Sequence, residues 1–157
     1  MPSKRSGSKK PLEGLLFTQT YAETDIESAA QGLLREIKSR AIKRKPLVVS
    51  CVGEMGAGKS TLIRACLKLL KADGDFKGSP TYALAHEYET LLGRVAHMDW
   101  YRIETSDELE NMGMRDYLSG RYAVLFIEWS DRFPEWLKGC TILLVALAHQ
   151  NNLRSLS

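Results

Sequence analysis

A glycine-rich stretch followed by a lysine and a serine, Gly53-Glu-Met-Gly-Ala-Gly-Lys-Ser60, carries the most recognisable chemistry in this sequence. Its spacing fits the phosphate-binding pattern of glycine, four residues, glycine, lysine and serine or threonine. Glycines let backbone N–H groups surround phosphate oxygens, the lysine neutralises the β- and γ-phosphates, and the serine hydroxyl can bind Mg²⁺. The alternative is a glycine-rich turn without a ligand. The pattern predicts a nucleotide site formed by Gly53, Glu54, Met55, Gly56, Ala57, Gly58, Lys59, Ser60 and Thr61.

The residues on either side of this motif predict the strand and the helix that such a loop requires. The segment 47–52 is short and mostly apolar, which is typical of a strand covered on both faces. After the loop, the spacing of apolar residues predicts a helix with one apolar face, and Arg64, Lys68 and Lys71 point away from that face. The apolar face consists of Leu62, Ile63, Ala65, Cys66, Leu69 and Leu70.

Two acids at the ends of expected strands are candidates for the hydrolytic chemistry. Hydrolysis of a nucleotide needs an acid that organises Mg²⁺ and a group that positions the attacking water. Glu128 ends the apolar stretch 122–128, and Asp99 ends the shorter stretch 97–99. Mg²⁺ keeps several of its waters, so one acid can act through water while the other lies closer. The alternative for each is a solvated strand end, which the five apolar residues before Glu128 make costly there.

Two further residues are left open by their sequence context. Thr81 follows a Ser-Pro pair in an expected loop, where its hydroxyl could reach the γ-phosphate or the metal as a switch residue does. His97 is either a proton carrier or, as is more common within a strand, a packed and hydrogen-bonded side chain. Tyr101 and Arg102 could face a partner or a substrate.

Strands that alternate with helices around the phosphate loop predict an α/β fold. We expect a P-loop NTPase-like three-layer sandwich with a mixed, largely parallel central sheet. Residues 82–88 and 94–100 alternate like a hairpin, which predicts that part of this sheet is antiparallel. We expect the remaining strands at 15–18, 122–128 and 141–147, a loop at 130–139, and helices that open on capping boxes at Thr24 and Thr105.

A chain of 157 residues with 44% hydrophobic residues is long enough for one domain with its own core. Of its 22 Lys and Arg residues, four lie in the first ten positions, so the remainder has 18 against 19 acids and is nearly neutral. We expect a disordered basic tail at 1–11, with a nucleic-acid-binding arm as the alternative, and a single P-loop ATPase domain at 12–157. Near-neutrality argues against a broad nucleic-acid-binding face.

The compartment is expected to be the cytoplasm. The basic tail lacks the apolar segment of a signal peptide, and no apolar run reaches the length of a membrane span. Cys51, Cys66 and Cys140 show no paired spacing. We interpret them as small buried residues in a reducing compartment rather than as metal ligands or nucleophiles.

Five segments in this order and spacing resemble the bacterial TsaE (YjeE) family of P-loop ATPases, over about residues 20–154. They are GEMGAGKST, SPTYALAHEY, HMDWYR, ELENMGMRDYL and FIEWSDR. The chain departs from the family pattern at Glu54, Trp100 and Ser130, where Asp, an aliphatic residue and Pro are usual. None of the three departures removes a phosphate or metal ligand.

The resemblance implies roles for the candidate residues. Lys59 and Ser60 would bind phosphate and metal, and Thr81 would be the switch-like threonine. Asp99 and Glu128 would serve Mg²⁺ and hydrolysis. The catalytic candidates are therefore Glu128, Asp99 and Thr81, and the metal candidates are Ser60, Thr81, Asp99 and Glu128.

The resemblance also implies a function. The protein would bind ATP or ADP with Mg²⁺ and hydrolyse ATP slowly when alone. It would act on a threonylcarbamoyl-transferase heterodimer of TsaB and TsaD type subunits, supporting threonylcarbamoyladenosine formation in tRNA that it touches indirectly. The alternatives are a small-molecule P-loop kinase and a nucleotide-dependent binding module without turnover. A kinase usually adds an arginine-rich lid, for which only Arg132 and Lys138 occupy a suitable loop.

Overall fold

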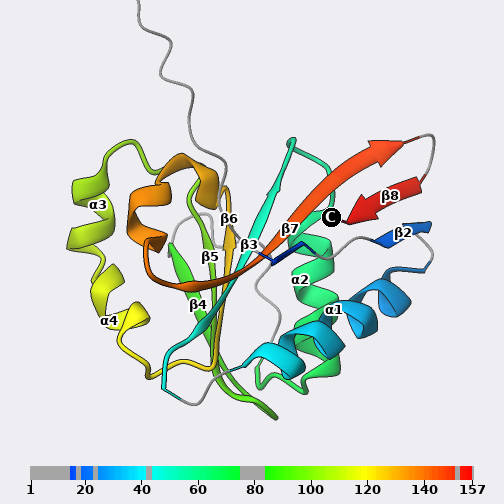
Figure 1. Ribbon diagram of the computed structural model, residues 1–157, viewed down its shortest axis with the longest axis horizontal. Coiled ribbons are helices and arrows are strands. Elements are labelled where there is room, and N and C mark those ends of the chain that lie inside the picture. Colours follow the sequence, from blue (N-terminus) through cyan, green and yellow to red (C-terminus); the bar gives the residue numbers. More distant parts are fainter. Residues whose placement is uncertain are drawn as a thin grey trace, which may run out of the picture.

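Fourteen elements are formed in the computed structural model, which describes residues 15–16, 19–22, 25–41, 44–74, 84–150 and 153–156 (Figure 1). They are β1 (Leu15–Leu16), β2 (Gln19–Ala22), α1 (Ile26–Arg40), β3 (Leu47–Gly53), α2 (Lys59–Leu69), β4 (Ala85–Thr90), β5 (Gly93–Asp99), α3 (Ser106–Asn111), α4 (Met114–Leu118), β6 (Val124–Glu128), the 3₁₀ turns η2 (Ser130–Arg132) and η3 (Pro134–Leu137), β7 (Thr141–Gln150) and β8 (Leu153–Leu156).

The sheet runs in the order β2-β8-β7-β3-β6-β5-β4, with β1 paired to β7. Strand β3 lies between β6 and β7 and is parallel to both, and β5 is parallel to β6. Strand β4 is antiparallel to β5, which confirms the expected hairpin, and β8 is antiparallel to both β7 and β2. The sheet is therefore mixed and largely parallel at its centre, as predicted. The pairing of β2 with β8 joins distant parts of the chain and was not predicted.

Helices cover both faces of this sheet, which confirms the three-layer arrangement (Figure 1). Helices α1 and α2 pack on one face over Val49, Cys51 and Phe126, and we call this the α1/α2 core. The other face carries Val48 and Met98 beneath α3, α4 and η3, and we call this the α3/α4 core. Alternate residues of each strand enter opposite cores, because successive side chains of a strand point to opposite faces.

The cysteines lie as expected of small apolar residues. Cys51 and Cys66 are fully buried and Cys140 is partly buried. Burial raises the pKa of all three thiols, because the apolar surroundings disfavour the thiolate.

Two local predictions need correction. Helix α1 begins at Ile26 with Asp25 at its N-cap, one residue later than the capping box expected at Thr24, which lies outside the described residues. Asp25 makes no side-chain capping bond to any described residue. The expected loop 130–139 contains the two 3₁₀ turns η2 and η3. Turn η3 begins at Pro134, whose fixed φ is well suited to the first position of a turn.

The capping box at Thr105 is present. The backbone N–H groups of Glu104 and Thr105 each donate to Glu108 Oε1 at 3.0 Å. These bonds hold the pKa of Glu108 below its ordinary value, since they stabilise the ionised carboxylate.

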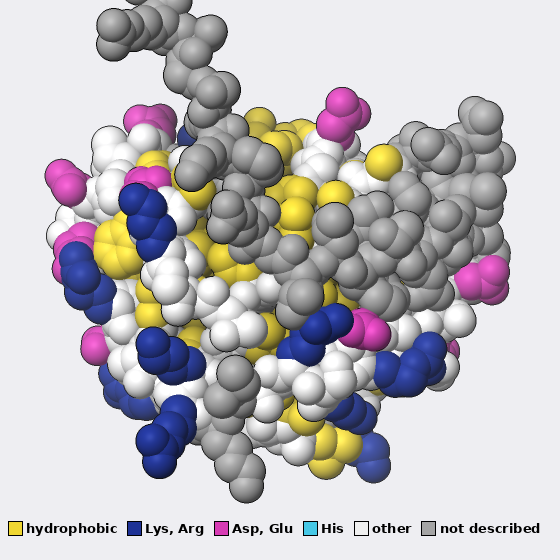
Figure 2. Space-filling view, in the orientation of Figure 1, with side chains coloured by type: hydrophobic (Ala, Val, Ile, Leu, Met, Phe, Trp, Pro, Cys, Tyr) yellow, Lys and Arg dark blue, Asp and Glu magenta, His cyan; other side chains and the backbone are white. Residues whose placement is uncertain are grey.

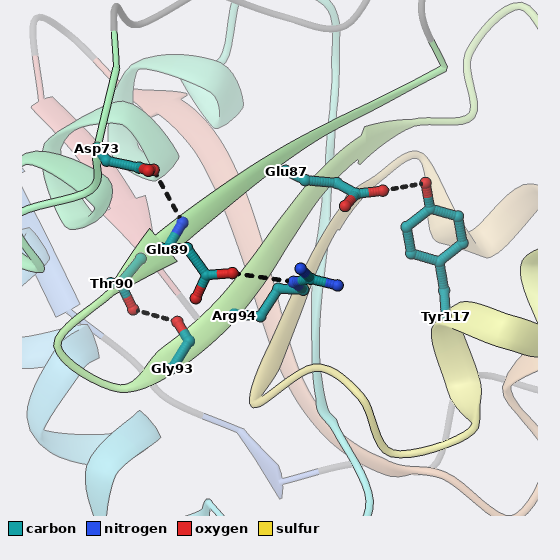
Figure 3. A network of polar contacts seen from close by, with 7 residues as sticks. All are labelled: Asp73, Glu87, Glu89, Thr90, Gly93, Arg94 and Tyr117. Atoms are coloured by element: carbon teal, nitrogen blue, oxygen red, sulfur yellow. Dashed lines mark hydrogen bonds and ion pairs between the residues drawn. The ribbon is translucent and has the colours of Figure 1, made fainter.

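A polar network fastens the β4–β5 hairpin to the helical layers on both sides of the sheet (Figure 3). Asp73, just after α2, accepts a bond from the Glu89 backbone N–H at 2.9 Å, and Glu89 pairs with Arg94 on the neighbouring strand. On the other side, the Tyr117 hydroxyl of α4 donates to Glu87 at 2.8 Å. These contacts hold the outer strand in place, and through it β5, whose far end carries Asp99.

The described surface carries both charge signs on the face in Figure 2, where Lys and Arg side chains lie over its lower and left parts and Asp and Glu lie among and above them. This agrees with the near-neutral composition of the chain after its first ten residues. None of the helices in the described part of the chain combines the length and apolar character that crossing a membrane requires.

Gly53 gives a test of how tightly the loop is seated on the sheet. Gly53 and Gly56 both have positive φ, 144° and 80°, so Ala at either position should cost about 1–2 kcal/mol of stability. A Cβ at Gly53 would also overlap the backbone carbonyl of Leu147 on β7, whereas one at Gly56 would meet no described atom within 4 Å. We expect Gly53→Ala to lower the free energy of unfolding by about 1–3 kcal/mol more than Gly56→Ala, measured by urea unfolding. Equal losses would contradict this close approach.

Candidate nucleotide-phosphate site

The phosphate loop connects the central strand β3 to α2, and its glycines have the backbone angles that the sequence demanded. Gly53, Gly56 and Gly58 all have positive φ, and Gly58 forms the left-handed N-cap of α2. The first N–H groups of a helix have no partner within it, and the helix dipole adds partial positive charge there. The start of α2 is therefore ready to bind an anion.

Lys59, the first residue of α2, is folded back across this loop. Its ammonium donates to the carbonyl oxygens of Gly53 and Glu54, both at 2.7 Å, and lies 4.3 Å from the centroid of the Trp129 ring. The side chain is only 4% exposed. Burial lowers the pKa of Lys59, and the negative charges of Glu128 and Asp99 oppose that shift.

Glu128, the last residue of β6, is buried and hydrogen-bonded from two directions. The residue is 3% exposed, so it is not a solvated strand end. Ser60 Oγ donates to Glu128 Oε1 at 2.7 Å and, in a longer branch, to Oε2 at 3.0 Å. His97 Nε2 contacts Oε1 at 2.6 Å. Ser60, Glu128 and His97 thus form one continuous chain of polar contacts from α2 through β6 to β5.

Asp99 lies beside Glu128 because of the sheet register. The two residues are direct partners at the ends of the parallel strands β5 and β6. Asp99 is partly exposed, and its Oδ1 accepts a bond from the Tyr101 backbone N–H at 2.9 Å. The structure therefore brings the two expected acids to one edge of the sheet, next to the loop.

Residues after β5 and β6 complete the walls of the site. Trp129 has a positive φ of 58°, and its ring lies 5.0 Å from that of Tyr101. Arg132 of η2 donates Nη1 to the carbonyl of Tyr101 and Nη2 to that of Ile103 at 2.9 Å. This guanidinium therefore fastens the turn that carries Tyr101 to the turn that carries Trp129.

Two of the residues that depart from the family pattern, Ser130 and Trp100, are buried away from the solvent. Ser130 is fully buried, and its hydroxyl shares a hydrogen bond with that of Ser50 on β3. Trp100 is also fully buried, in the α3/α4 core, edge-on to Phe133. Neither residue contributes to the wall of the pocket at the phosphate loop.

A pocket of about 260 Å³ lies between the phosphate loop and the residues at the ends of β5 and β6. Its wall consists of Met55, Gly56, Gly58, Lys59, Ser60, Thr61, Asp99, Tyr101, Glu128 and Trp129. A larger pocket of about 690 Å³ lies between α3, α4 and η3, and its wall includes Arg115, Trp136 and Lys138 but none of the predicted site residues.

The oxygen atoms around the smaller pocket suit Mg²⁺. The Ser60 hydroxyl and the carboxylates of Asp99 and Glu128 all line it, and hard cations prefer oxygen ligands. The described residues contain no group of three or more His, Cys, Asp or Glu side chains able to hold a metal by themselves. A bound Mg²⁺ would therefore have to keep water or phosphate oxygens in its shell, as Mg²⁺ usually does.

The structure adds three residues to those predicted and leaves one untested. His97, Tyr101 and Trp129 contact or line the site. The sequence left the roles of His97 and Tyr101 open, and Trp129 belongs to the FIEWSDR segment. The spacing of two between His97 and Asp99, which places both side chains on the same face of a strand, is the local signal that could have indicated His97. Thr81 lies outside the described residues.

The family model described as "Threonylcarbamoyl adenosine biosynthesis protein TsaE" matches residues 20–156, which is most of the chain. The chain belongs to the TsaE family. This agrees with the resemblance carried by its five sequence segments.

Individual relatives agree with this membership. The tRNA threonylcarbamoyladenosine biosynthesis protein TsaE of Haemophilus influenzae is 39% identical over 109 residues, 69% of this chain and 68% of that protein. The protein of the same name from Aquifex aeolicus is 36% identical over 98 residues, 62% of this chain and 65% of that protein. The matched parts thus span about two thirds of these relatives.

The crystal structure of Bacillus subtilis YdiB is similar in fold, with a TM-score of 0.59, 20% sequence identity and coverage of 90% of this chain and 84% of that one. At this level of identity the likeness supports the fold alone.

Arg132 offers a test of how the walls of the site are held. Arg132→Ala should lower the free energy of unfolding by about 1.5–3 kcal/mol, because two carbonyls lose a charged donor. The control is Arg121→Ala, whose exposed pair with Asp116 at 3.4 Å should contribute at most about 1 kcal/mol. Urea unfolding of both variants measures the difference. If Arg132→Ala is as stable as the control but binds nucleotide more weakly, Arg132 faces the ligand instead.

Proposed function

We propose that this protein binds ATP and Mg²⁺, hydrolyses the ATP to ADP and phosphate, and thereby supports threonylcarbamoyladenosine modification of tRNA. The observation that carries the proposal is the arrangement of Lys59, Ser60, Asp99 and Glu128 around one pocket at the start of α2. Membership of the TsaE family and the names of the relatives support the tRNA pathway.

In this proposal the loop binds the phosphates and the strand ends serve the reaction. The N–H groups at the start of α2 and the ammonium of Lys59 neutralise phosphate oxygens. To do so, the ammonium of Lys59 would exchange its hydrogen bonds to the carbonyls of Gly53 and Glu54 for contacts with the phosphates. Mg²⁺, when bound, polarises the γ-phosphate. We propose that Ser60 and Glu128 would hold it and that Asp99 would orient a water beside them; the hydrogen bond between Ser60 and Glu128 and the strand pairing of Asp99 with Glu128 support these roles.

The kinase alternative is disfavoured by the two basic residues that would have to cover the nucleotide. Arg132 is already committed to the carbonyls of Tyr101 and Ile103. Lys138 lines the larger pocket near α3 and α4 rather than the loop. A phosphoryl-transfer lid of the usual arginine-rich kind would have to be built from other residues.

The partner in this proposal is the threonylcarbamoyl-transferase heterodimer of TsaB and TsaD type subunits, with tRNA contacted indirectly and the whole process cytoplasmic. Two large apolar side chains, Met55 and Tyr101, are 67% and 41% exposed and border the pocket, where a docked protein would sense the nucleotide. Thr81 is the proposed switch residue that couples the γ-phosphate to that surface. The catalytic unit is the single domain at 12–157, with the basic tail at 1–11 outside it.

The two acids should affect hydrolysis more than binding. We expect Glu128→Gln and Asp99→Asn to keep ATP affinity within about tenfold, or 1.4 kcal/mol, while turnover falls much further. Their charges act on the metal and on water rather than on the whole nucleotide. Lys59→Ala should instead abolish tight binding, since it removes the cation that faces the phosphates. Calorimetry with ATP and Mg²⁺ and a phosphate-release assay measure the two quantities.

Asp107→Asn is the matched control, because Asp107 is an exposed acid of α3 that does not line the pocket at the phosphate loop. It should behave like the parent protein in both assays. Parent-like turnover in either acid variant would assign that acid a structural role, and phosphorylation of a metabolite would replace the ATPase proposal with the kinase.

The partner proposal predicts slow turnover by the isolated protein and faster turnover in the assembly. Adding the purified heterodimer should raise ATP turnover several-fold or more, because docking would supply contacts of the arginine-finger kind, which typically accelerate such reactions by about 10³ to 10⁵. Thr81→Ala should reduce this rise in turnover without weakening ADP binding. The control Ser119→Ala, which removes an exposed hydroxyl after α4, should leave the rise unchanged. Equal rates with and without the heterodimer would argue against this partner.

A further inference from the structure

The buried carboxylate of Glu128 has a second hydrogen-bonding partner that the proposed chemistry does not use. Its side chain contacts Ser60 at the start of α2 and His97 in the middle of β5. The Glu128 and His97 side chains are 4% and 3% exposed, so this contact is almost wholly buried. An ionised carboxylate in such a place needs donors from the protein itself.

The register of the sheet explains why a histidine of β5 reaches the end of β6. His97 is the direct partner of Phe126, which lies two residues before Glu128 on the same face of β6. Phe126 belongs to the α1/α2 core, so this face of the sheet is the one on which α2 lies. The side chains of His97 and Glu128 therefore share the space beneath the start of α2.

The distances show how the two oxygens of Glu128 differ. Oε1 receives the shorter bond from Ser60 at 2.7 Å and the contact with His97 at 2.6 Å. Oε2 receives only the longer branch from Ser60, at 3.0 Å. An ionised carboxylate only accepts hydrogen bonds, so His97 contacts Oε1 through an Nε2–H group, which the neutral ring also possesses. With Oε1 occupied twice, Oε2 is the oxygen left for further bonding.

We propose that His97 is a positioning residue for the ATPase site, which donates to Glu128 Oε1 and so presents Oε2 to the pocket. This inference rests on the proposed function, because it assumes that Glu128 serves Mg²⁺ and hydrolysis. His97 itself touches neither the nucleotide nor the metal. It acts by limiting the rotation of the Glu128 carboxylate, which Ser60 alone holds from one side only.

Three substitutions at His97 separate this hydrogen bond from general packing. His97→Gln keeps an N–H donor at the distance of Nε2, His97→Asn keeps a donor that is too short to reach, and His97→Leu has no donor. We expect His97→Leu and His97→Asn to lower kcat by about tenfold or more, the order expected for the loss of one hydrogen bond to a charged group. KM for ATP should stay within about threefold, and His97→Gln should recover most of kcat.

Met98→Leu is the matched control, because Met98 is the next residue of β5 and is fully buried in the opposite core. It should leave kcat unchanged. If His97→Leu folds poorly, the comparison of Gln with Asn still decides the question, since both are polar. Equal kcat in those two variants, or a loss confined to KM, would overturn the proposal.

A second measurement keeps this inference separate from the ATPase proposal. Calorimetric titration with ADP, in the presence and absence of Mg²⁺, gives the gain in affinity that the metal supplies. His97→Leu and His97→Asn should shrink this gain, and His97→Gln should preserve it. If the parent protein hydrolyses no ATP, the proposed function fails, but the gain still reports on His97. If the parent hydrolyses ATP and all His97 variants keep the full gain and the parent kcat, only the inference about His97 fails.

Discussion

The buried carboxylate of Glu128 imposes the strictest requirement on this structure. A charge that is 3% exposed at the end of an apolar strand is tolerated only when donors surround it. Those donors come from α2 and from β5, two elements far from β6 in sequence. The strands, the phosphate loop and α2 must therefore take their observed positions together, because displacing α2 or β5 would remove one of the two partners of the carboxylate.

The parallel pairing of β3 with β6 satisfies this requirement. Cys51 on β3 is the partner of Glu128, so the loop begins two residues beyond the point where the acid lies. The backbone N–H of Trp129 also donates to the Cys51 carbonyl, which continues the pairing past the end of β6. The start of α2 is thus held within hydrogen-bonding distance of Glu128.

The turn after β6 contains a residue with strained backbone angles, Trp129. Trp129 adopts a positive φ that is unfavourable for a bulky residue, and two polar contacts lie beside it. The hydroxyls of Ser130 and Ser50 tie the turn to β3, and Arg132 ties it to the carbonyls after β5. The indole of Trp129 consequently remains over the ammonium of Lys59.

Much of the site could be predicted from local sequence. Glycines at the positions that need positive φ, followed by an amphipathic helix, determine the phosphate loop without reference to distant residues. Acids directly after apolar strands indicated Glu128 and Asp99, because the carboxyl ends of parallel strands share one edge of a sheet.

Only the tertiary structure decided which side chains surround those acids. The contact of His97 with Glu128 depends on the register between β5 and β6, and the role of Arg132 depends on two turns meeting in space. The pairing of β2 with β8 is likewise non-local. Local sequence determines backbone angles and helical or strand periodicity, whereas the partner of a buried polar group is selected by the packing of segments that are distant along the chain.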